Sequence, residues 1–169
     1  MSERDQLRAV IDEAQTRFMA AIDDFPDLVL ETEPAVGAWS PRDVTGHVVD
    51  WQEEILAAAK HILGEKKPAW HPIKDGEGYN MTQAAMRGTD SWSAVQRDFA
   101  NVREQIFAFI DGLDEQQLKA IGPYPWGEIG TLQRLLRDIA GHLDEHAAQL
   151  EAWRLQRTGV RVDRGFEQN

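Results

Sequence analysis

The sequence predicts an all-α protein, a four-helix bundle with crossover connections and one short extra helix. Apolar residues recur at three- and four-residue steps through most of the chain, which is the spacing of one buried helix face. No alternating strand pattern and no internal repeat interrupts this periodicity. Four such stretches of about twenty residues or more bury their apolar faces most simply against one another. The segments between them are long for a simple up-down bundle, which favours crossovers.

The first helix is predicted from Ser2 to about Phe25, because its apolar residues keep to one face. They are Leu7, Val10, Ala14, Phe18, Ile22 and Phe25. The following stretch, "FPDLVLETEPAVGAW", contains two internal prolines and a glycine that break the periodicity. It is therefore predicted to be a connector.

The second helix has the clearest start, "WSPRDV". Ser40 suits the N-cap, Pro41 the first helical position and Asp43 the third, where a carboxylate is favourable. Trp39 is expected to close over Val44 as a hydrophobic staple. The apolar stripe then continues to the glycine of "HILG", which ends the helix. Its members are Val44, His47, Trp51, Ile55, Ala58 and Ile62.

The second half of the chain is predicted to hold two more long helices. Residues 65–77 form a loop, and "GYNMTQAAMRG" can hold only a short helix. The third long helix runs from about Trp92 to Ile110, after the capping cluster "TDS". We expect a helical turn at "DEQQL" and a loop at "GPYPWGEIG". Thr131 then caps a last helix that reaches about Thr158.

Length and composition narrow the class of protein. The 169 residues fit one helical-bundle domain at 1–158 with a short C-terminal tail at 159–169. A formal net charge of -11 argues against a nucleic-acid partner, because a polyanion would be repelled. No stretch approaches the ~20 apolar residues of a membrane span. The absence of cysteine excludes disulfides and thiolate metal sites, and fits a cytoplasmic protein.

Three of the five histidines fall on predicted apolar stripes. His142 and His146 are one turn apart on the last helix, so their rings can point the same way, and His47 has a similar place on the second helix. Neutral imidazole is a good ligand for zinc, nickel, copper or iron. Three histidines would leave coordination positions open, as in a catalytic site. The alternative is that each is a core histidine with one hydrogen bond satisfied.

Three carboxylates lie near these histidines in the sequence. Asp50, Glu54 and Asp138 could each orient an imidazole N–H or act as a general base. Glu54 is favoured because it is two turns from His47 and keeps near the same face. The alternative for any acidic residue in so acidic a chain is a solvated helix face.

Other candidate residues are polar or aromatic. Asn80 and Tyr79, on the short helix, are candidates for lining the pocket, with simple packing as the alternative. His61 is expected at the surface near a helix C-terminus, and His71 is expected to be exposed on the loop. Three tryptophans at cap and stripe positions are interpreted as core residues, namely Trp39, Trp51 and Trp153.

Two stretches carry a family resemblance. "WSPRDVTGHVVDWQ" and "GHLDEHAAQLEAW" are similar, in order and separation, to the signature stretches of the DinB/YfiT-like superfamily. The resemblance covers most of the chain, including "GYNMTQAAM". It implies a four-helix bundle with crossover connections. It also implies a divalent metal held by His47, His142 and His146 with waters completing the shell. We expect zinc or nickel, although three histidines and water suit several ions.

The resemblance leaves the reaction open. Members of the superfamily include enzymes that use bacillithiol, mycothiol or glutathione, and metal-dependent hydrolases. A related branch, the ClbS/DfsB-like self-protection proteins, is similar in "DGEGYNMTQ". The sequence carries no diagnostic thiol-binding segment. We therefore predict a metal-dependent enzyme acting on a small molecule, a hydrolase or a low-molecular-weight thiol S-transferase, and a homodimer. The alternatives are a non-catalytic binding or self-protection protein, and a structural protein acting through dimerisation.

Overall fold

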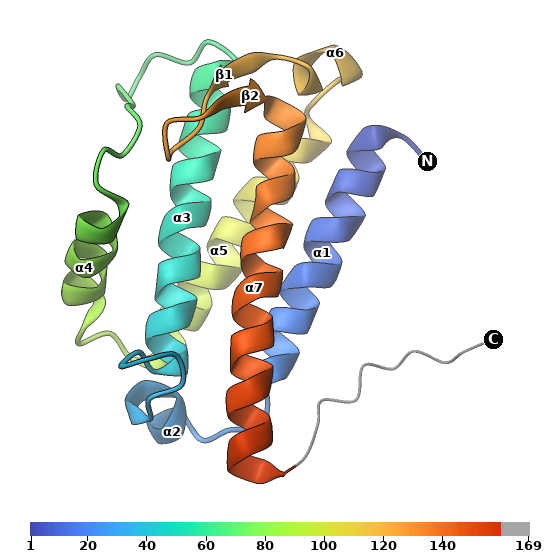
Figure 1. Cartoon of the computed structure of the whole chain (residues 1–169). Helices are drawn as coiled ribbons and strands as arrows, with labels where there is room; N and C mark the ends of the chain where they lie inside the picture. The colour runs from blue at the N-terminus through green and yellow to red at the C-terminus, as the bar shows by residue number, and fades with distance from the viewer. Residues whose placement is uncertain (160–169) are drawn as a thin grey trace.

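The computed structural model describes residues 1–159 and confirms the predicted bundle (Figure 1). The long helices are α1 (Glu3–Ile22), α3 (Pro41–Ile62), α5 (Trp92–Asp111) and α7 (Leu132–Thr158). The connections contain α2 (Asp27–Thr32), α4 (Gly76–Arg87), α6 (Glu115–Leu118), β1 (Ile121–Pro123) and β2 (Ile129–Thr131). The predicted tail, apart from its first residue, lies outside the described residues. Within residues 1–159 no helix combines the length and the apolar character needed to cross a membrane.

The order of the helices around the bundle differs from their order in the chain. α1 packs mainly on α7, and α3 packs on both α5 and α7. In Figure 1, α3 and α5 run upward, whereas α1 and α7 run downward. Arg42 at the start of α3 donates to the carbonyl of Asp90 just before α5, at 3.0 Å, so these two helices begin at the same end. The connection between them therefore returns along the whole bundle, which is the predicted crossover.

The predicted caps form as the sequence indicates. Ser40 accepts from the backbone N–H of Asp43 at 3.2 Å, and the Asp43 carboxylate accepts from the N–H of Ser40 at 3.0 Å. Thr131 caps α7 by accepting from the N–H of Arg134. Each cap satisfies backbone donors that the helix cannot pair, and is worth about 1 kcal/mol. Local chemistry thus fixes where α3 and α7 begin.

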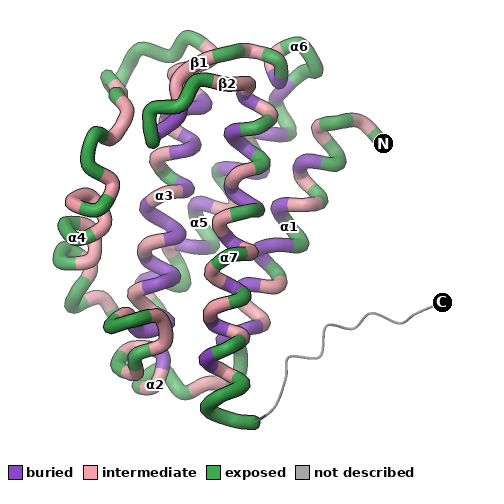
Figure 2. Tube along the Cα trace, viewed as in Figure 1, coloured by how far each residue is buried: buried purple, intermediate pink, exposed green. Residues whose placement is uncertain are grey.

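The predicted apolar stripes of α3 and α7 are largely buried, for example at Val44 and Leu150, but the three histidines are exceptions. Val48, Leu143 and Ala147 are fully buried, whereas the three histidines are only partly buried. In Figure 2 the buried residues face the centre of the bundle, and the half-buried ones flank them. At 3.6 residues per turn, a residue next to a core position is turned by about 100° away from it. The histidines therefore border the core and open onto the surface, which corrects the expectation that they lie on the buried stripe.

Two connectors contain structure that the sequence pattern did not reveal. The stretch predicted as a plain connector contains α2, and the loop predicted at "GPYPWGEIG" is a hairpin in which Gly122 pairs with Gly130. Gly127 takes a φ of +92°, which the turn requires and glycine adopts without strain. Tyr124 is fully buried beneath the hairpin and donates to the carbonyl of Thr131 at 2.8 Å. Three-residue strands are too short to show an alternating pattern.

The short helix α4 lies on the outside of α3 and has no buried residue. Arg87 near its end pairs with Asp50 of α3 at 2.7 Å and with Asp98 of α5 at 2.9 Å. Gly46 permits this approach, because a Cβ there would lie 2.8 Å from Cδ of Arg87. Glu54 accepts from Tyr79 of α4 at 3.3 Å. Polar contacts rather than a buried apolar face thus hold α4 in place.

Candidate metal centre

Three imidazole nitrogens from two helices converge at one point. Nε2 of His142 lies 3.1 Å from Nε2 of His47 and 2.9 Å from Nε2 of His146. One ligand atom from each of the three residues lies within 4.8 Å of the others. Two nitrogens bound to the same zinc ion are about 3.4 Å apart, given Zn–N bonds of about 2.1 Å in tetrahedral geometry. The spacing therefore fits one divalent ion.

The hydrogen bonds around the histidines also favour a cation. Oε1 of Gln149 lies 2.7 Å from Nδ1 of His146. An amide oxygen only accepts, so the proton of His146 is on Nδ1 and its Nε2 presents a lone pair. Nε2 of His142 carries at most one hydrogen and so can satisfy only one of its two neighbours. The remaining contact then lacks a hydrogen bond, and a cation shared by the three nitrogens would satisfy it.

Burial keeps the rings of His47 and His142 neutral, which is the form of imidazole that binds a metal ion. It lowers the pKa of His47 to about 4 and that of His142 to about 3, from an ordinary value of 6.5, and positive charge on His146 lowers the pKa of both further. A hydrogen bond with Asn80 acts in the opposite direction on the pKa of His47. Because neutral imidazole is the form that binds metal, these two rings are ready to coordinate at neutral pH.

The nitrogens face a pocket of about 510 Å³ between α3, α4, α7 and the hairpin. Trp51 and Ile55 line it from α3, and Trp126 lines it from the hairpin. Asn80 lines it from α4 and accepts from Nε1 of Trp51 at 2.7 Å. The pocket gives a small molecule access to the histidines.

The α7 side of the pocket is acidic. Asp138 lies one turn before His142 and Glu145 lies just under one turn after it, and both line the pocket together with Gly141. Burial raises the pKa of Asp138, while the charge of Arg134 lowers it. Asp138 has the position beside the histidines that the sequence indicated. Whether it orients an imidazole or moves a proton stays a prediction.

The structure places the other predicted carboxylates elsewhere. Asp50 is buried and paired with Arg87, and Glu54 accepts from Trp70 at 3.0 Å and from Tyr79. Neither lines the pocket with the histidines. The preference for Glu54 assumed that two helical turns keep a side chain near His47, but its carboxylate turns toward the 65–77 loop and α4. Their predicted catalytic role therefore has no support from their positions.

Of the two residues of α4 that were predicted to line the pocket, only one does so. Asn80 lines the pocket, whereas Tyr79 lies behind it with its ring 5.2 Å from that of Trp51. Trp51 is a pocket wall and not the core residue expected. Trp39 is partly buried against the core and its ring lies 5.0 Å from that of His47. Trp153 is buried in the core as predicted.

Four residues of the site were missed in the sequence, namely Gly141, Glu145, Gln149 and Trp126. Gln149 follows His146 by three residues, so the rule that such side chains meet on a helix could have found it. Glu145 also lies on this face, beside His146 in the sequence, and was hidden among many acidic residues. Trp126 had no sequence signal, because only the fold of the hairpin brings it over the histidines.

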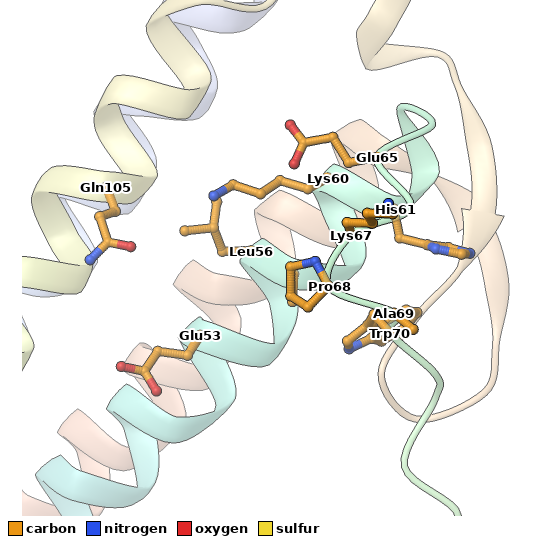
Figure 3. Close-up of a pocket in the computed structure, with 11 residues that line it drawn as sticks. Glu53, Leu56, Lys60, His61, Glu65, Lys67, Pro68, Ala69, Trp70 and Gln105 are labelled. Carbon is orange, nitrogen blue, oxygen red and sulfur yellow. The ribbon is translucent and has the colours of Figure 1, made fainter.

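A second pocket of about 270 Å³ lies on the opposite face of α3, toward α5 (Figure 3). The loop of residues 65–70 closes one side of it, and Trp70 covers His61 with ring centres 5.5 Å apart. His61 is thus partly buried rather than at the surface, whereas His71 is exposed as predicted. No histidine triad lines this pocket, and it is separate from the candidate metal centre.

The fold and the site define a helical-bundle protein with a three-histidine group that could hold a metal ion. The sequence pattern of the DinB superfamily matches residues 11–150, so the chain belongs to this superfamily. This confirms the family predicted from the two histidine motifs. An uncharacterized relative, YuaE of Bacillus subtilis (strain 168), is 25% identical, and the similarity covers 85% of this chain and 94% of YuaE.

Solved structures share the architecture. YfiT from Bacillus subtilis, a probable metal-dependent hydrolase with an unusual four-helix bundle topology, is similar with a TM-score of 0.71 and 23% identity. The similarity covers 94% of this chain and 90% of YfiT. The Sibling Lethal Factor Precursor, DfsB, gives a TM-score of 0.77 at 16% identity over 94% of this chain and 98% of DfsB. At these identities the likeness establishes a common fold.

Proposed function

We propose that the protein is a metal-dependent hydrolase of a small molecule, with one zinc or nickel ion held by His47, His142 and His146. The observation that carries the proposal is the convergence of three Nε2 atoms on one open pocket. A structural zinc site has four protein ligands, whereas three protein ligands leave a position for water or substrate. When bound, a divalent ion supplies Lewis-acid chemistry that activates a nucleophile and polarises a substrate carbonyl.

The residues of the chain divide the remaining work. Gln149 holds the ring of His146 by accepting from its Nδ1–H, which keeps Nε2 directed at the other two imidazoles. Asn80 interacts with His47 and so links α4 to the site. Glu145 lines the pocket within one turn of both His142 and His146, and we assign it the role of general base that takes the proton of the attacking water. Asp50 and Glu54 then serve to anchor α4 and the 65–77 loop.

Hydrolysis is favoured over thiol transfer by the charge of the pocket. Among the described residues that line it, the ionised side chains are Asp138 and Glu145, and none is lysine or arginine. Glutathione and similar thiols carry carboxylates, for which the pocket offers no lysine or arginine as a partner. Water needs no such recognition. The predictions of a cytoplasmic location and a homodimer rest on the absence of cysteine and on the family, and they stay predictions.

The test uses protein purified without a histidine tag. Elemental analysis should find about one transition metal per chain, as expected for a three-histidine site. A panel of activated esters, lactones, amides and thiol adducts is then assayed with and without low-molecular-weight thiols, using the metal-loaded protein, the chelator-treated protein and His146→Ala. We expect metal-dependent hydrolysis that needs no thiol. Turnover only with a thiol would instead establish a transferase, and bound metal without any turnover would favour a sequestering protein.

A further inference from the structure

The upper half of the metal pocket, next to the hairpin, combines aromatic walls with a carboxylate. The rings of Trp51 and Trp126 lie 6.5 Å apart at 51°, so they form two sides of an open V. Tyr124 supports Trp126 from beneath, with ring centres 5.5 Å apart. Asp138 lines the same pocket and lies close enough to Tyr124 to raise its pKa. Tryptophan faces beside a carboxylate are the usual surroundings of a bound organic cation.

Arg134, whose charge lowers the pKa of Asp138, is already paired with another carboxylate. Arg134, one turn before Asp138, forms an ion pair with Glu128 at 3.2 Å and lies over the ring of Tyr124. Its side chain is more than half exposed. Asp138 has no ion pair or hydrogen bond to its side chain among the contacts of residues 1–159. A ligand that supplies a positive charge would therefore find an acceptor that the chain leaves available.

A glycine in the middle of α7 leaves room for this ligand. Gly141 lines the pocket between Asp138 and Glu145, and a Cβ there would meet no atom within 4 Å. Its φ is not positive and no neighbour packs against it, so neither strain nor close packing explains it. Glycine inside a helix makes the helix less stable than alanine would. The lower helix stability at Gly141 is therefore accompanied by open space in the pocket. The space lies directly above the α7 backbone, one residue from His142.

We propose that the substrate of this site is a small organic cation, an alkyl or arylalkyl amine that also carries an ester or amide bond, whose apolar part lies over Gly141 and whose ammonium group sits between Asp138 and the ring of Trp126. The reaction assigned to this substrate rests on the proposed function, whereas its binding does not. The two carboxylates of the pocket offset the charge of a divalent ion at the histidines, so a cationic ligand is not repelled. The acidic chain as a whole attracts cations as well.

The probes are benzylamine, benzyl alcohol and benzoate, which share one ring and differ in charge. Each is titrated by calorimetry into chelator-treated and zinc-loaded protein, and the zinc content of every sample is measured. We expect benzylamine to bind about tenfold more tightly than benzyl alcohol in both forms, because a charge-assisted hydrogen bond and a cation–π contact are added. Benzoate is expected to be the weakest ligand of the chelator-treated protein. Equal affinity for all three, or preference for the anion in the chelator-treated form, would overturn the proposal.

Three variants locate the cation. Asp138→Asn should lower the affinity for benzylamine about tenfold and leave that for benzyl alcohol unchanged, since only the charge is removed. Trp126→Ala should weaken both ligands. Glu104→Gln removes an exposed carboxylate of α5 outside the pocket and is the matched control, with no expected effect. An unchanged preference for the amine in Asp138→Asn contradicts the assignment of Asp138.

Gly141→Leu tests the open space without touching a ligand of the metal. Leucine favours the helix, so the melting temperature should stay the same or rise, the zinc content should not change, and binding of every probe should be lost. Ala148→Leu adds the same side chain to an exposed position of α7 outside the pocket, and should bind as the parent does. If Gly141→Leu bound the probes as tightly as the parent, the proposed position of the ligand over Gly141 would be wrong. If the parent protein bound no zinc but still preferred benzylamine, the metal centre would be refuted and the cation site would stand.

Discussion

Nε2 of His47 lies 3.1 Å from Nε2 of His142, although 95 residues separate them in the chain. The contact joins α3 to α7, which pack side by side in the bundle. An ion shared by these helices would bind the folded chain and not the unfolded one. Such linkage adds about 2.7 kcal/mol of stability when the free ligand is at a hundred times its dissociation constant. Metal binding and folding stability should therefore change together.

Replacing His146 with alanine should abolish metal uptake. The change removes one of three ligands and leaves the helix intact, because alanine is a strong helix former. We expect elemental analysis to find no retained metal, circular dichroism to show unchanged helicity, and added zinc to cause no rise in the melting temperature. His71→Ala, at an exposed loop histidine, is the matched control and should bind as the parent does. Metal content equal to the parent's would reject the triad.

Replacing Gln149 with leucine should weaken metal binding without abolishing it. Gln149 fixes the tautomer and direction of the His146 ring, and loss of such a partner costs about 10- to 100-fold in metal affinity. The measurement is competition with a chromophoric chelator. Gln105→Leu, an exposed glutamine at the second pocket, should leave the affinity unchanged. If Gln149→Leu kept the parent's affinity, Gln149 would have no part in orienting His146.

Acidification should destabilise the metal-free protein. The pKa of His47 is about 4 and that of His142 about 3 in the folded chain, below the ordinary 6.5, so the unfolded chain binds more protons. The stability that these histidines contribute is therefore fully present above pH 6.5. It is lost as the pH falls toward their pKa values in the folded chain. Urea unfolding between pH 6.5 and about 5 avoids most carboxylate titration.

The histidine contribution can be isolated by one substitution. His142→Leu should flatten the decline of the unfolding free energy over this pH range, because one neutral, partly buried imidazole with a lowered pKa is removed. His71→Leu should retain the slope of the parent. A slope that is the same in all three proteins would mean that His142 titrates alike in the folded and unfolded chains.

Breaking the pair between Arg87 and Asp50 should destabilise the fold without affecting the metal. Arg87→Met leaves a buried carboxylate unpaired, which costs about 3 kcal/mol or more, measured by urea unfolding. The double variant Arg87→Met, Asp50→Leu should recover most of that loss, since no unpaired charge remains. Metal content should equal the parent's in both. Loss of bound metal in the double variant would instead return Asp50 to the site, as its place in the sequence had indicated.

The sequence alone determined the long helices, their caps and the three histidines. These features depend on contacts within a turn or two, such as Ser40 with Asp43. Residues that are close in the sequence make such contacts, so the sequence is enough to predict them. Membership of the DinB superfamily followed from two such stretches. Periodicity identified the buried face of each helix but not its edges, and the histidines lie at an edge, next to the fully buried Val48, Leu143 and Ala147.

Only the tertiary structure decided what surrounds the histidines. Trp126 reaches the pocket through a hairpin with strands too short to be predicted, and Glu54 turns away because α4 and the 65–77 loop supply its donors. Asp50 likewise pairs with Arg87, which is 37 residues away in the chain. Which partner a carboxylate finds depends on how distant segments pack, and that packing balances burial, charge and chain entropy over the whole molecule.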